Sequence, residues 1–298
     1  MLTYNEQMKM LVFGFGYTAS HISSLLRRKG YEFVATVRTR AKAHNVNQAG
    51  VTARVYSSNH ADAQIVEDIR SSDAILMSVP PNEHGDPVLR SFASQIAQAG
   101  NLRWVGYLST VGVYGDHAGN WVDEKTPTMT ENGRLLDRTT AEKQWLALGA
   151  HVFRLSGIYG PGRNQLVQLA AGTARRIVKP NQVFNRVHVA DIATVIEASL
   201  TKSRPGSIYN VTDNEPAPPQ VVVEFAAGLC GLEPPPEIPF ESAELSPMAR
   251  SFYSHNRRVR NDLIREELGV ALSYPSYREG LAALRAEGDG PGGEVRPG

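Results

Sequence analysis

KMLVFGFGYTASHISSLLRRKG, residues 9–30, contains the transition that decides the fold. The apolar run from Lys9 to Phe15 is typical of a short buried strand. Residues 20–30 have the spacing of a helix and end at Gly30, a residue suited to a left-handed cap. Between the two lies Gly14-x-Gly16-x-x-Ala19. The stretch therefore predicts a strand, a tight glycine turn and a helix in immediate succession.

The glycine turn has the spacing of a dinucleotide-binding loop. The first glycine allows the tight turn, the second lets a pyrophosphate approach the backbone, and the small third residue lets the helix pack closely on the strand. The helix start then offers free N–H groups and partial positive charge to phosphates. A plain strand-to-helix turn is the alternative interpretation. The cofactor-binding residues predicted in this turn are Gly14, Phe15, Gly16, Tyr17 and Thr18.

The second expected strand, 31–37, ends in basic residues. A site that prefers NAD would place an Asp or Glu about twenty residues after the glycine loop, to hold the ribose 2′-hydroxyl. The sequence has Arg38, Thr39 and Arg40 there instead. Guanidinium groups suit a 2′-phosphate. The segment favours NADP, with NAD possible, although strand ends near the surface often carry arginine for no such reason.

Apolar runs alternate with amphipathic stretches through the first two-thirds of the chain. Such alternation is typical of a parallel sheet flanked by helices. Further strands are expected at 51–57, 73–81, 103–110 and 151–159, and helices at 60–72, 91–100 and 134–146. The pattern predicts an α/β fold with a doubly wound parallel sheet.

The pattern changes after residue 163. The sequence predicts a helix at 164–176, a strand leading into a helix at 183–200, a strand at 206–212, and helices at 220–231, 257–269 and 275–287. Residues 1–163, completed by 187–215, are expected to form a cofactor-binding domain. Residues 164–186 and 216–284 are expected to form a smaller C-terminal substrate-binding domain. Residues 285–298 have no apolar period and are expected to be a disordered tail.

Composition and charge are those of an ordinary globular protein. The chain is 42% hydrophobic, and its 31 Lys and Arg nearly balance its 30 Asp and Glu, which predicts neither a nucleic-acid nor a membrane partner. The single cysteine, Cys230, permits no intrachain disulfide, and the polar opening 1–9 lacks the apolar stretch of a secretory signal. A cytoplasmic location is expected. The eight histidines show no metal-ligand spacing, so no metal site is predicted.

Two later stretches carry a family resemblance. LSTVGVYGD, 108–116, and RLSGIYGPGR, 154–163, resemble the extended short-chain dehydrogenase/reductase family of the NAD(P)-dependent epimerase/dehydratase type. VHVADIA, IYNVTDNEP and RRVRNDLIREELG are similar to the later pattern of that family's atypical bacterial branch. The resemblance covers roughly residues 9–284 and implies a Rossmann domain, a smaller substrate domain and a cleft between them.

The resemblance also implies site residues. Thr110 falls on the family's catalytic Ser/Thr, which hydrogen-bonds the reacting oxygen, although threonine is also common at strand ends. Residues implied to line the cofactor near its ribose are Ser78, Val79, Pro80 and Pro81, continued by Leu108 and Ser109. Residues implied to border the nicotinamide or the substrate are Gly157, Tyr159, Gly160 and Pro161.

The family's proton-transfer signature, Tyr-x-x-x-Lys followed four residues later by an acid, is altered. Aligning that acid with Glu142 places Arg134 at the tyrosine position and Arg138 at the lysine position. Arginine stays protonated up to about pH 12 and has no acceptor, so Arg134 cannot be an ordinary general acid or base. Arg138 could still donate to the nicotinamide ribose. Arg134 could bind a carboxylate or phosphate, or stabilise an oxyanion.

Two alternatives remain open for these arginines and for the reaction. The arginines could instead pair with acids of the preceding loop, such as Asp123 or Glu124. If chemistry occurs, another group must move the proton, and the side chains near the cleft motifs are Tyr114, Tyr159, His188, Asp116 and His117. Tyr114 is the one predicted to be catalytic beside Thr110. His188 and Asp191 are expected to belong to a helix start that packs on the sheet.

Two functions from different classes follow. The first is an NADP-dependent oxidoreductase, or an epimerase/dehydratase-like enzyme, acting on a small carbonyl, hydroxyl or nucleotide-sugar-like substrate. The second is a cofactor-binding protein without turnover, such as a redox sensor or an assembly factor. The missing tyrosine is the reason for the second, because function depends on the site and not on the fold. Either protein could be a monomer or a homodimer.

Overall fold

The computed structural model describes residues 8–57, 60–129 and 133–293, and the chain forms two compact units. The first unit contains the described residues up to Val113, together with Met129–Arg154 and Ala193–Tyr209. The second contains Tyr114–Thr128, Leu155–Ile192 and the chain from Asn210 onward. The expected cofactor domain had included residues 114–128 and 155–163, which belong here to the second unit.

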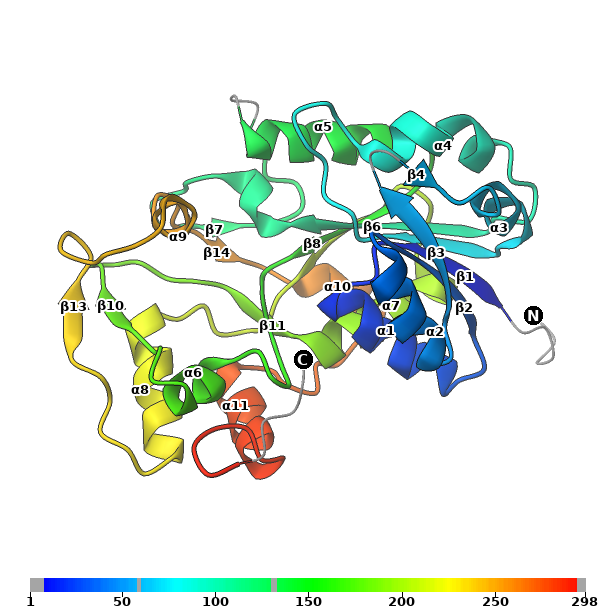
Figure 1. Ribbon diagram of the computed structural model, residues 1–298. Coiled ribbons are helices and arrows are strands. Elements are labelled where there is room, and N and C mark those ends of the chain that lie inside the picture. The colour runs from blue at the N-terminus through cyan, green and yellow to red at the C-terminus, as the bar shows by residue number, and fades with distance from the viewer. Residues whose placement is uncertain (1–7, 58–59, 130–132, 294–298) are drawn as a thin grey trace. The chain divides into compact units, whose positions relative to one another are not determined.

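A twisted sheet of eight strands forms the centre of the first unit (Figure 1). Its strands are β1 (Lys9–Phe13), β2 (Glu32–Val37), β3 (Thr52–Ser57), β4 (His60–Ala61), β5 (Ala74–Met77), β6 (Trp104–Thr110), β8 (His151–Leu155) and β12 (Ile208–Val211). Their order is β12-β8-β6-β5-β1-β2-β3-β4. Parallel pairs join β1 to β2 and β5, β2 to β3, and β5 to β6, whereas β4 pairs antiparallel with β3. The strand order reverses beside β1, which confirms the predicted α/β fold.

Helices cover both faces of this sheet. They are α1 (Tyr17–Arg27), α2 (Arg40–Gln48), α3 (Ile65–Ser71), α4 (Pro87–Ala97) and α5 (Arg134–Ala147). Figure 1 shows α1 and α2 on one face and α3, α4 and α5 on the other. The strands are apolar on both sides because both sides are covered, and Leu11, Phe13, Ile75, Tyr107 and Trp145 pack in one buried cluster.

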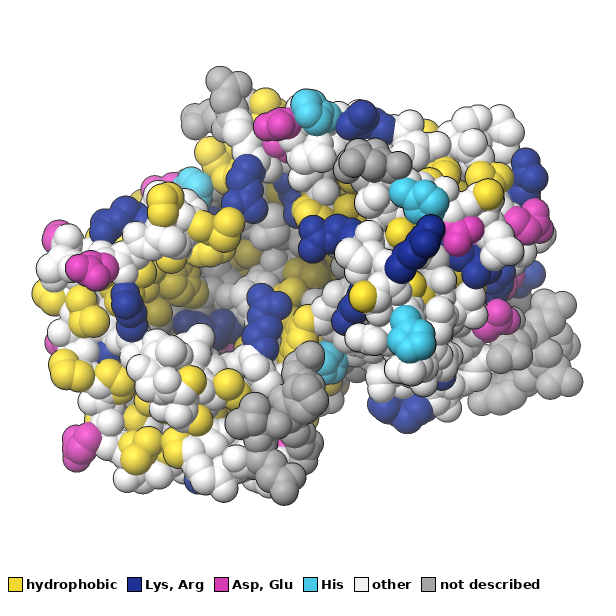
Figure 2. All heavy atoms as spheres, in the orientation of Figure 1, with side chains coloured by type: hydrophobic (Ala, Val, Ile, Leu, Met, Phe, Trp, Pro, Cys, Tyr) yellow, Lys and Arg dark blue, Asp and Glu magenta, His cyan; other side chains and the backbone are white. Residues whose placement is uncertain are grey.

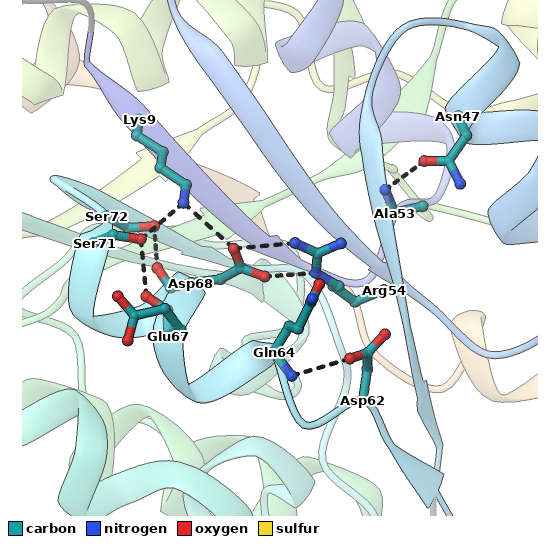
Figure 3. A network of polar contacts seen from close by, with 10 residues as sticks. All are labelled: Lys9, Asn47, Ala53, Arg54, Asp62, Gln64, Glu67, Asp68, Ser71 and Ser72. Atoms are coloured by element: carbon teal, nitrogen blue, oxygen red, sulfur yellow. Dashed lines mark hydrogen bonds and ion pairs between the residues drawn. The ribbon is translucent and has the colours of Figure 1, made fainter.

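A polar network ties α3 to the sheet (Figure 3). The buried carboxylate of Asp68 on α3 accepts from Lys9 Nζ of β1 at 3.3 Å and from Arg54 Nε of β3 at 2.8 Å. Lys9 Nζ also donates to Ser71 Oγ at 2.8 Å. One acidic side chain therefore links a helix to two strands that are not neighbours in the sheet.

The second unit is built around three helices, α6 (Gln165–Ala170), α8 (Pro219–Leu229) and α11 (Tyr277–Ala286). Leu166, Val222 and Leu281, one from each helix, are buried in a common cluster with Tyr159. Two elements, η1 (Val111–Tyr114) and α7 (Val189–Lys202), lie mostly in the first unit and partly in the second. The other elements of the second unit are α9 (Pro247–Phe252), α10 (Asp262–Glu266), and the strands β7 (Trp121–Val122), β9 (Gly157–Tyr159), β10 (Arg176–Val178), β11 (Arg186–His188), β13 (Glu237–Pro239) and β14 (Arg258–Val259). The short strands form three parallel pairs, β7 with β14, β9 with β11, and β10 with β13.

Three expected helices are shorter than the sequence indicated. Residues 60–61 of the expected helix 60–72 form β4, and the helix begins only at Ile65. The helix expected at 164–176 ends at Ala170, because Gly172 turns the chain with a positive φ of 64° before β10. The helix expected at 257–269 begins at Asp262, since Arg258 and Val259 pair as a strand with β7.

The segment expected to be a disordered tail contains ordered structure. Residues 285 and 286 belong to α11, and the Asp289 side chain is buried. Its Oδ2 accepts from Gly162 N at 3.0 Å and from Asn164 Nδ2 at 2.6 Å. Residues 285–293 are therefore ordered, although a disordered tail was expected from residue 285. The rest of the expected tail, residues 294–298, lies outside the described part of the chain. The lack of an apolar period did not predict this order, because polar contacts of Asp289 hold the segment.

The surface gives no sign of a membrane span. None of the helices within the described ranges combines the length and the apolar composition required to cross a bilayer. Basic and acidic side chains both occur on the face shown in Figure 2, as the near-zero net charge leads one to expect.

Candidate cofactor and active site

The glycine turn lies where the strand order reverses, at the carboxyl ends of β1 and β5. Gly14 N donates to Thr36 Oγ1 at 2.9 Å and Phe15 N to Thr36 O at 3.0 Å, so the turn is fixed to β2. Gly14 has a φ of 87°, and a Cβ there would lie 2.9 Å from Val79 Cγ2. Both the backbone conformation and the close approach require glycine at this position.

The start of α1 is open. Gly16 is the N-cap residue, makes no side-chain cap bond, and no acidic residue lies in the first turn. A Cβ added at Gly16 would meet no protein atom within 4 Å, so nothing within the described structure requires glycine there. Tyr17 and Thr18 follow as the first helical residues. A helix start that is uncapped and faces open space fits a phosphate group.

Exposed cations gather at the end of β2. Arg38 and Arg40 are both exposed. Lys42, which was not among the predicted cofactor-binding residues, is exposed too. Thr39 is the N-cap residue of α2, where its hydroxyl accepts from Lys42 N at 3.2 Å. The first turn of α2 contains no acidic residue. Three exposed basic residues therefore occur at the end of β2 and in the first turn of α2, at the positive end of that helix.

The end of β5 forms the other wall of the turn. Ser78 N donates to Phe13 O at 2.9 Å, which holds the two strand ends side by side. Ser78 and Val79 are half-buried, and Pro80 is exposed. Ser78 and Val79 therefore lie beside Gly14, at the edge of the sheet where doubly wound folds bind ligands.

At the end of β6, Ser109 is directed to α5. Its hydroxyl donates to Glu142 Oε1 at 2.5 Å, and Glu142 Oε2 accepts from Arg154 Nη2 of β8 at 2.8 Å. All three side chains are buried. The hydroxyl of Ser109 is thus engaged within the protein, whereas the neighbouring Thr110 is half-buried and its Oγ1 accepts from Gly112 N at 3.1 Å.

The two arginines of α5 have different surroundings. Arg134, in the first turn, is exposed. Arg138 is half-buried, and its Nη1 donates to Tyr107 OH at 3.0 Å and to Leu108 O at 3.2 Å. Neither makes an ion pair within the described part of the first unit. Arg138 is thereby joined to β6 at Tyr107 and Leu108.

Asp123 and Glu124, the alternative partners for these arginines, make hydrogen bonds within the second unit. Asp123 Oδ1 accepts from the backbone of Lys125 and from Thr126, which closes a turn. Glu124 Oε1 accepts from Asn210 N at 2.8 Å.

The remaining candidates for proton transfer also lie in the second unit. The Tyr114 hydroxyl is buried and donates to Asn210 Oδ1 at 2.7 Å. Tyr159 donates to Ser276 O at 3.3 Å, and burial raises the pKa of this phenol above its ordinary value. Gly157 N donates to Asn185 O within the β9 pairing. The hydroxyl groups of Tyr114 and Tyr159 therefore each donate to an acceptor within the protein.

Asp116, the acidic candidate, and Asp191, expected at a helix start, both accept hydrogen bonds from the backbone. Asp116 Oδ1 accepts from Asn256 N at 2.7 Å, and this backbone N–H lowers the pKa of the Asp116 carboxyl. The Asp191 carboxylate accepts from Ser273 N and Tyr274 N, while burial raises its pKa. His188 stacks near Tyr274 with ring centroids 4.0 Å apart. Within the described residues, no group of three potential metal ligands occurs.

Several functional side chains could not have been found from the sequence. Tyr107 and Arg154 contact α5 from strands β6 and β8, and no local spacing indicates these contacts. Thr36 is the residue that anchors the glycine turn. Lys42 could have been found from the sequence, since it continues the alternation of basic residues at Arg38 and Arg40.

Comparison with known proteins gives relatives along the whole chain. No family model matches it. A solved structure of a conserved protein of unknown function from Silicibacter pomeroyi is 47% identical, covers 94% of this chain and 99% of that chain, and has a TM-score of 0.85. A protein from Methylobacillus flagellatus assigned to the NAD-dependent epimerase/dehydratases is 26% identical, covers 95% of this chain and 99% of that chain, and has a TM-score of 0.74.

One curated protein is also similar. The 3-diazoavenalumate denitrifying reductase of Streptomyces sp is 30% identical over 159 residues, which are 49% of this chain and 49% of that protein. The match therefore spans about half the length of this relative. The two structural relatives, in contrast, cover both units.

Proposed function

The chain belongs to the epimerase/dehydratase type of the short-chain dehydrogenase/reductase family, and from that premise we propose that it is an NADP(H)-binding oxidoreductase. The observation that carries the proposal is the glycine turn at the β1–β5 edge. Gly14 approaches Val79 closely, and the start of α1 at Gly16 is open and uncapped. This arrangement suits the pyrophosphate of a nicotinamide dinucleotide, the cofactor class of the epimerase/dehydratase relatives.

The choice of NADP over NAD rests on the end of β2. Arg38, Arg40 and Lys42 are exposed there, and no carboxylate occurs in the first turn of α2 to bind a free 2′-hydroxyl. A 2′-phosphate adds negative charge that these cations attract, and the guanidinium forks can bind it with two hydrogen bonds each. The same charges leave the 2′-hydroxyl of NAD without a carboxylate acceptor.

The bound nicotinamide would supply or accept a hydride. Arg138, held by Tyr107 and Leu108, has further N–H groups to donate to a ribose hydroxyl. The Thr110 hydroxyl orients the reacting oxygen of a small carbonyl or hydroxyl compound or of a nucleotide-sugar-like substrate. Arg134 contributes a fixed positive charge for an anionic group of the substrate. With arginine at the tyrosine position, water would give the proton to the oxygen when a carbonyl accepts the hydride, and would take the proton when a hydroxyl compound loses the hydride.

A reductase activity is also the reaction class named for the Streptomyces relative. We carry only that class, reduction by hydride, to this chain. Its proposed compartment is the cytoplasm, where the one thiol, Cys230, would remain reduced. Its proposed partner is a small molecule, with no nucleic acid or membrane involved, and its proposed state is a monomer or a homodimer.

A sensor or assembly factor that binds NADP(H) without turnover is the second candidate. The observation that favours it is the pair of arginines, since neither can transfer a proton at neutral pH. Tyr114 and Tyr159, the phenols in the neighbouring motifs, donate to protein acceptors.

Titration of the purified full chain with NADPH and with NADH by calorimetry tests the proposal. We expect binding of both, tighter for NADPH. Incubation with NADPH and a panel of aldehydes, ketones and nucleotide sugars should then show loss of nicotinamide absorbance with at least one compound. Absence of heat with either dinucleotide would overturn the proposal. Tight binding with no turnover across the panel would favour the sensor.

A further inference from the structure

The hydroxyl group of Tyr107 is an unusual feature of the core beneath the site. The side chain belongs to β6, is fully buried, and stacks on Trp145 of α5 with ring centroids 6.1 Å apart. Its OH accepts from Arg138 Nη1 at 3.0 Å. Burial raises the pKa of this phenol, so the hydroxyl stays neutral and offers Arg138 a fixed acceptor.

The ring that carries this hydroxyl has little freedom. Trp145, against which it stacks, is itself fixed by a hydrogen bond from Nε1 to Asp86 Oδ2 at 2.9 Å. The other carboxylate oxygen of Asp86 caps α4 by accepting from Val88 N and Leu89 N. Tyr107 is therefore part of a buried arrangement that joins β6, α4 and α5.

Arg138 has one end of its guanidinium occupied and the other open. Nη1 is shared between Tyr107 OH and Leu108 O. Among the described residues, none accepts a hydrogen bond from Nε or Nη2 of Arg138. A guanidinium has five N–H groups in one plane, so fixing Nη1 also fixes the directions in which the remaining groups can donate. A lysine at this position would have had no such plane to orient.

We propose that Tyr107 is a positioning residue that, together with the Leu108 carbonyl, holds the Arg138 guanidinium ready to bind the cofactor. This inference rests on the proposed function, which places Arg138 at the nicotinamide ribose. A free arginine side chain loses rotamer entropy when it is ordered. Tyr107 removes part of that loss before the ligand arrives, so affinity increases without any contact between Tyr107 and the cofactor.

The test is Tyr107→Phe, which removes the hydroxyl and keeps the stacked ring. Tyr56→Phe is the matched control, because Tyr56 is also a buried tyrosine of the same sheet, and its OH donates to Pro87 O at 2.7 Å without contacting Arg138. We expect Tyr107→Phe to raise the NADPH dissociation constant about three- to tenfold, the scale of one lost hydrogen bond. Tyr56→Phe should leave it within about twofold. Thermal melting of both variants measures any common loss of stability.

A double-variant cycle separates positioning from general support of the core. In an Arg138→Ala background, Tyr107→Phe should cause no further loss of NADPH affinity, since the group it positions is gone. An equal loss in both backgrounds, or an equal effect of the two tyrosine variants, would overturn the positioning role while the proposed function stands. A wild-type chain that binds neither dinucleotide would overturn both.

Discussion

Glu142 is the residue that joins α5 to the two strands beneath it. Its buried carboxylate receives the Ser109 hydroxyl and the Arg154 guanidinium. Replacing one partner of a buried ion pair leaves the other charge without compensation. We therefore predict that Glu142→Leu lowers the free energy of unfolding by about 3–5 kcal/mol, measured by urea denaturation.

The pair can be removed as a whole. In Glu142→Leu combined with Arg154→Met, no buried charge is left alone, and apolar side chains of similar size fill the space. This double variant should recover most of the lost stability. A double variant as unstable as the single one would show that the ion pair is not what makes Glu142 important.

Arg38 tests the recognition of the 2′-phosphate at the scale of one residue. Arg38→Asp places a carboxylate where a 2′-hydroxyl could use it and a 2′-phosphate would be repelled. We predict a fall of at least about tenfold in the preference for NADPH over NADH, the scale of one charge-assisted hydrogen bond. Arg70→Asp, at an exposed arginine of α3, is the control. An unchanged preference in Arg38→Asp would assign the arginine to the solvated surface.

Single residues could be predicted from the sequence where a local spacing carries the signal. Gly14 and Gly16 follow from the turn they form, and Arg38 follows from its distance to that turn. Tyr107 and Arg154 could not, because their partners lie 31 and 12 residues away along the chain and meet them only through the packing of α5 on β6 and β8. Nor did any local spacing indicate that the hydroxyl of Ser109 donates to Glu142, 33 residues away along the chain.

At the scale of elements, replacing Asp68 should destabilise the contact of α3 with β1 and β3. It connects α3 to β1 through Lys9 and to β3 through Arg54. Asp68→Ala leaves two partly buried cations without their acceptor, and we predict a loss of about 3 kcal/mol in the free energy of unfolding. Denaturant unfolding of the purified variant measures it.

Asp62→Ala is the comparison for that measurement. Asp62 precedes the same helix, but its Oδ1 accepts only from Gln64 N at 3.0 Å among the described contacts. The expected cost is about 1 kcal/mol, that of one lost hydrogen bond. Equal losses in the two variants would mean that the link from Asp68 to the strands contributes little.

Elements were predictable where a long apolar or amphipathic period dominates. The strands β1, β2 and β6 and the helix α5 lie where the sequence indicated them. The errors fall on short elements, such as β10 and β14, where two or three residues pair with a strand that is distant along the chain. Such pairs follow from tertiary contact, and their sequences read equally well as part of the adjoining helix.

For the molecule as a whole, pH should affect stability through Asp213. The side chain is buried, and burial raises its pKa to about 8 from an ordinary value of 3.8. The folded state therefore holds a proton that the unfolded chain releases, so this contribution is complete below about pH 4 and is lost as pH rises through about 8. We predict that unfolding free energy falls between pH 7 and pH 9.

Asp213→Asn keeps the shape of the side chain and cannot ionise. Its unfolding free energy should change less between pH 7 and pH 9 than that of the unaltered protein, when both are measured by denaturant unfolding in the same buffers. The variant should also melt at a higher temperature at pH 9. Parallel curves for the two proteins would assign the pH dependence to other groups.

The strand order has a consequence for how the protein is made. β12, at residues 208–211, is an edge strand of a sheet whose first strand is residues 9–13. During synthesis, the amino-terminal half emerges from the ribosome and can pair its own strands. The edge along β8 has no neighbouring strand until β12 has been made. An unpaired edge strand invites association with another chain. Nascent copies paused between residues 155 and 208 should therefore be the ones most dependent on chaperones.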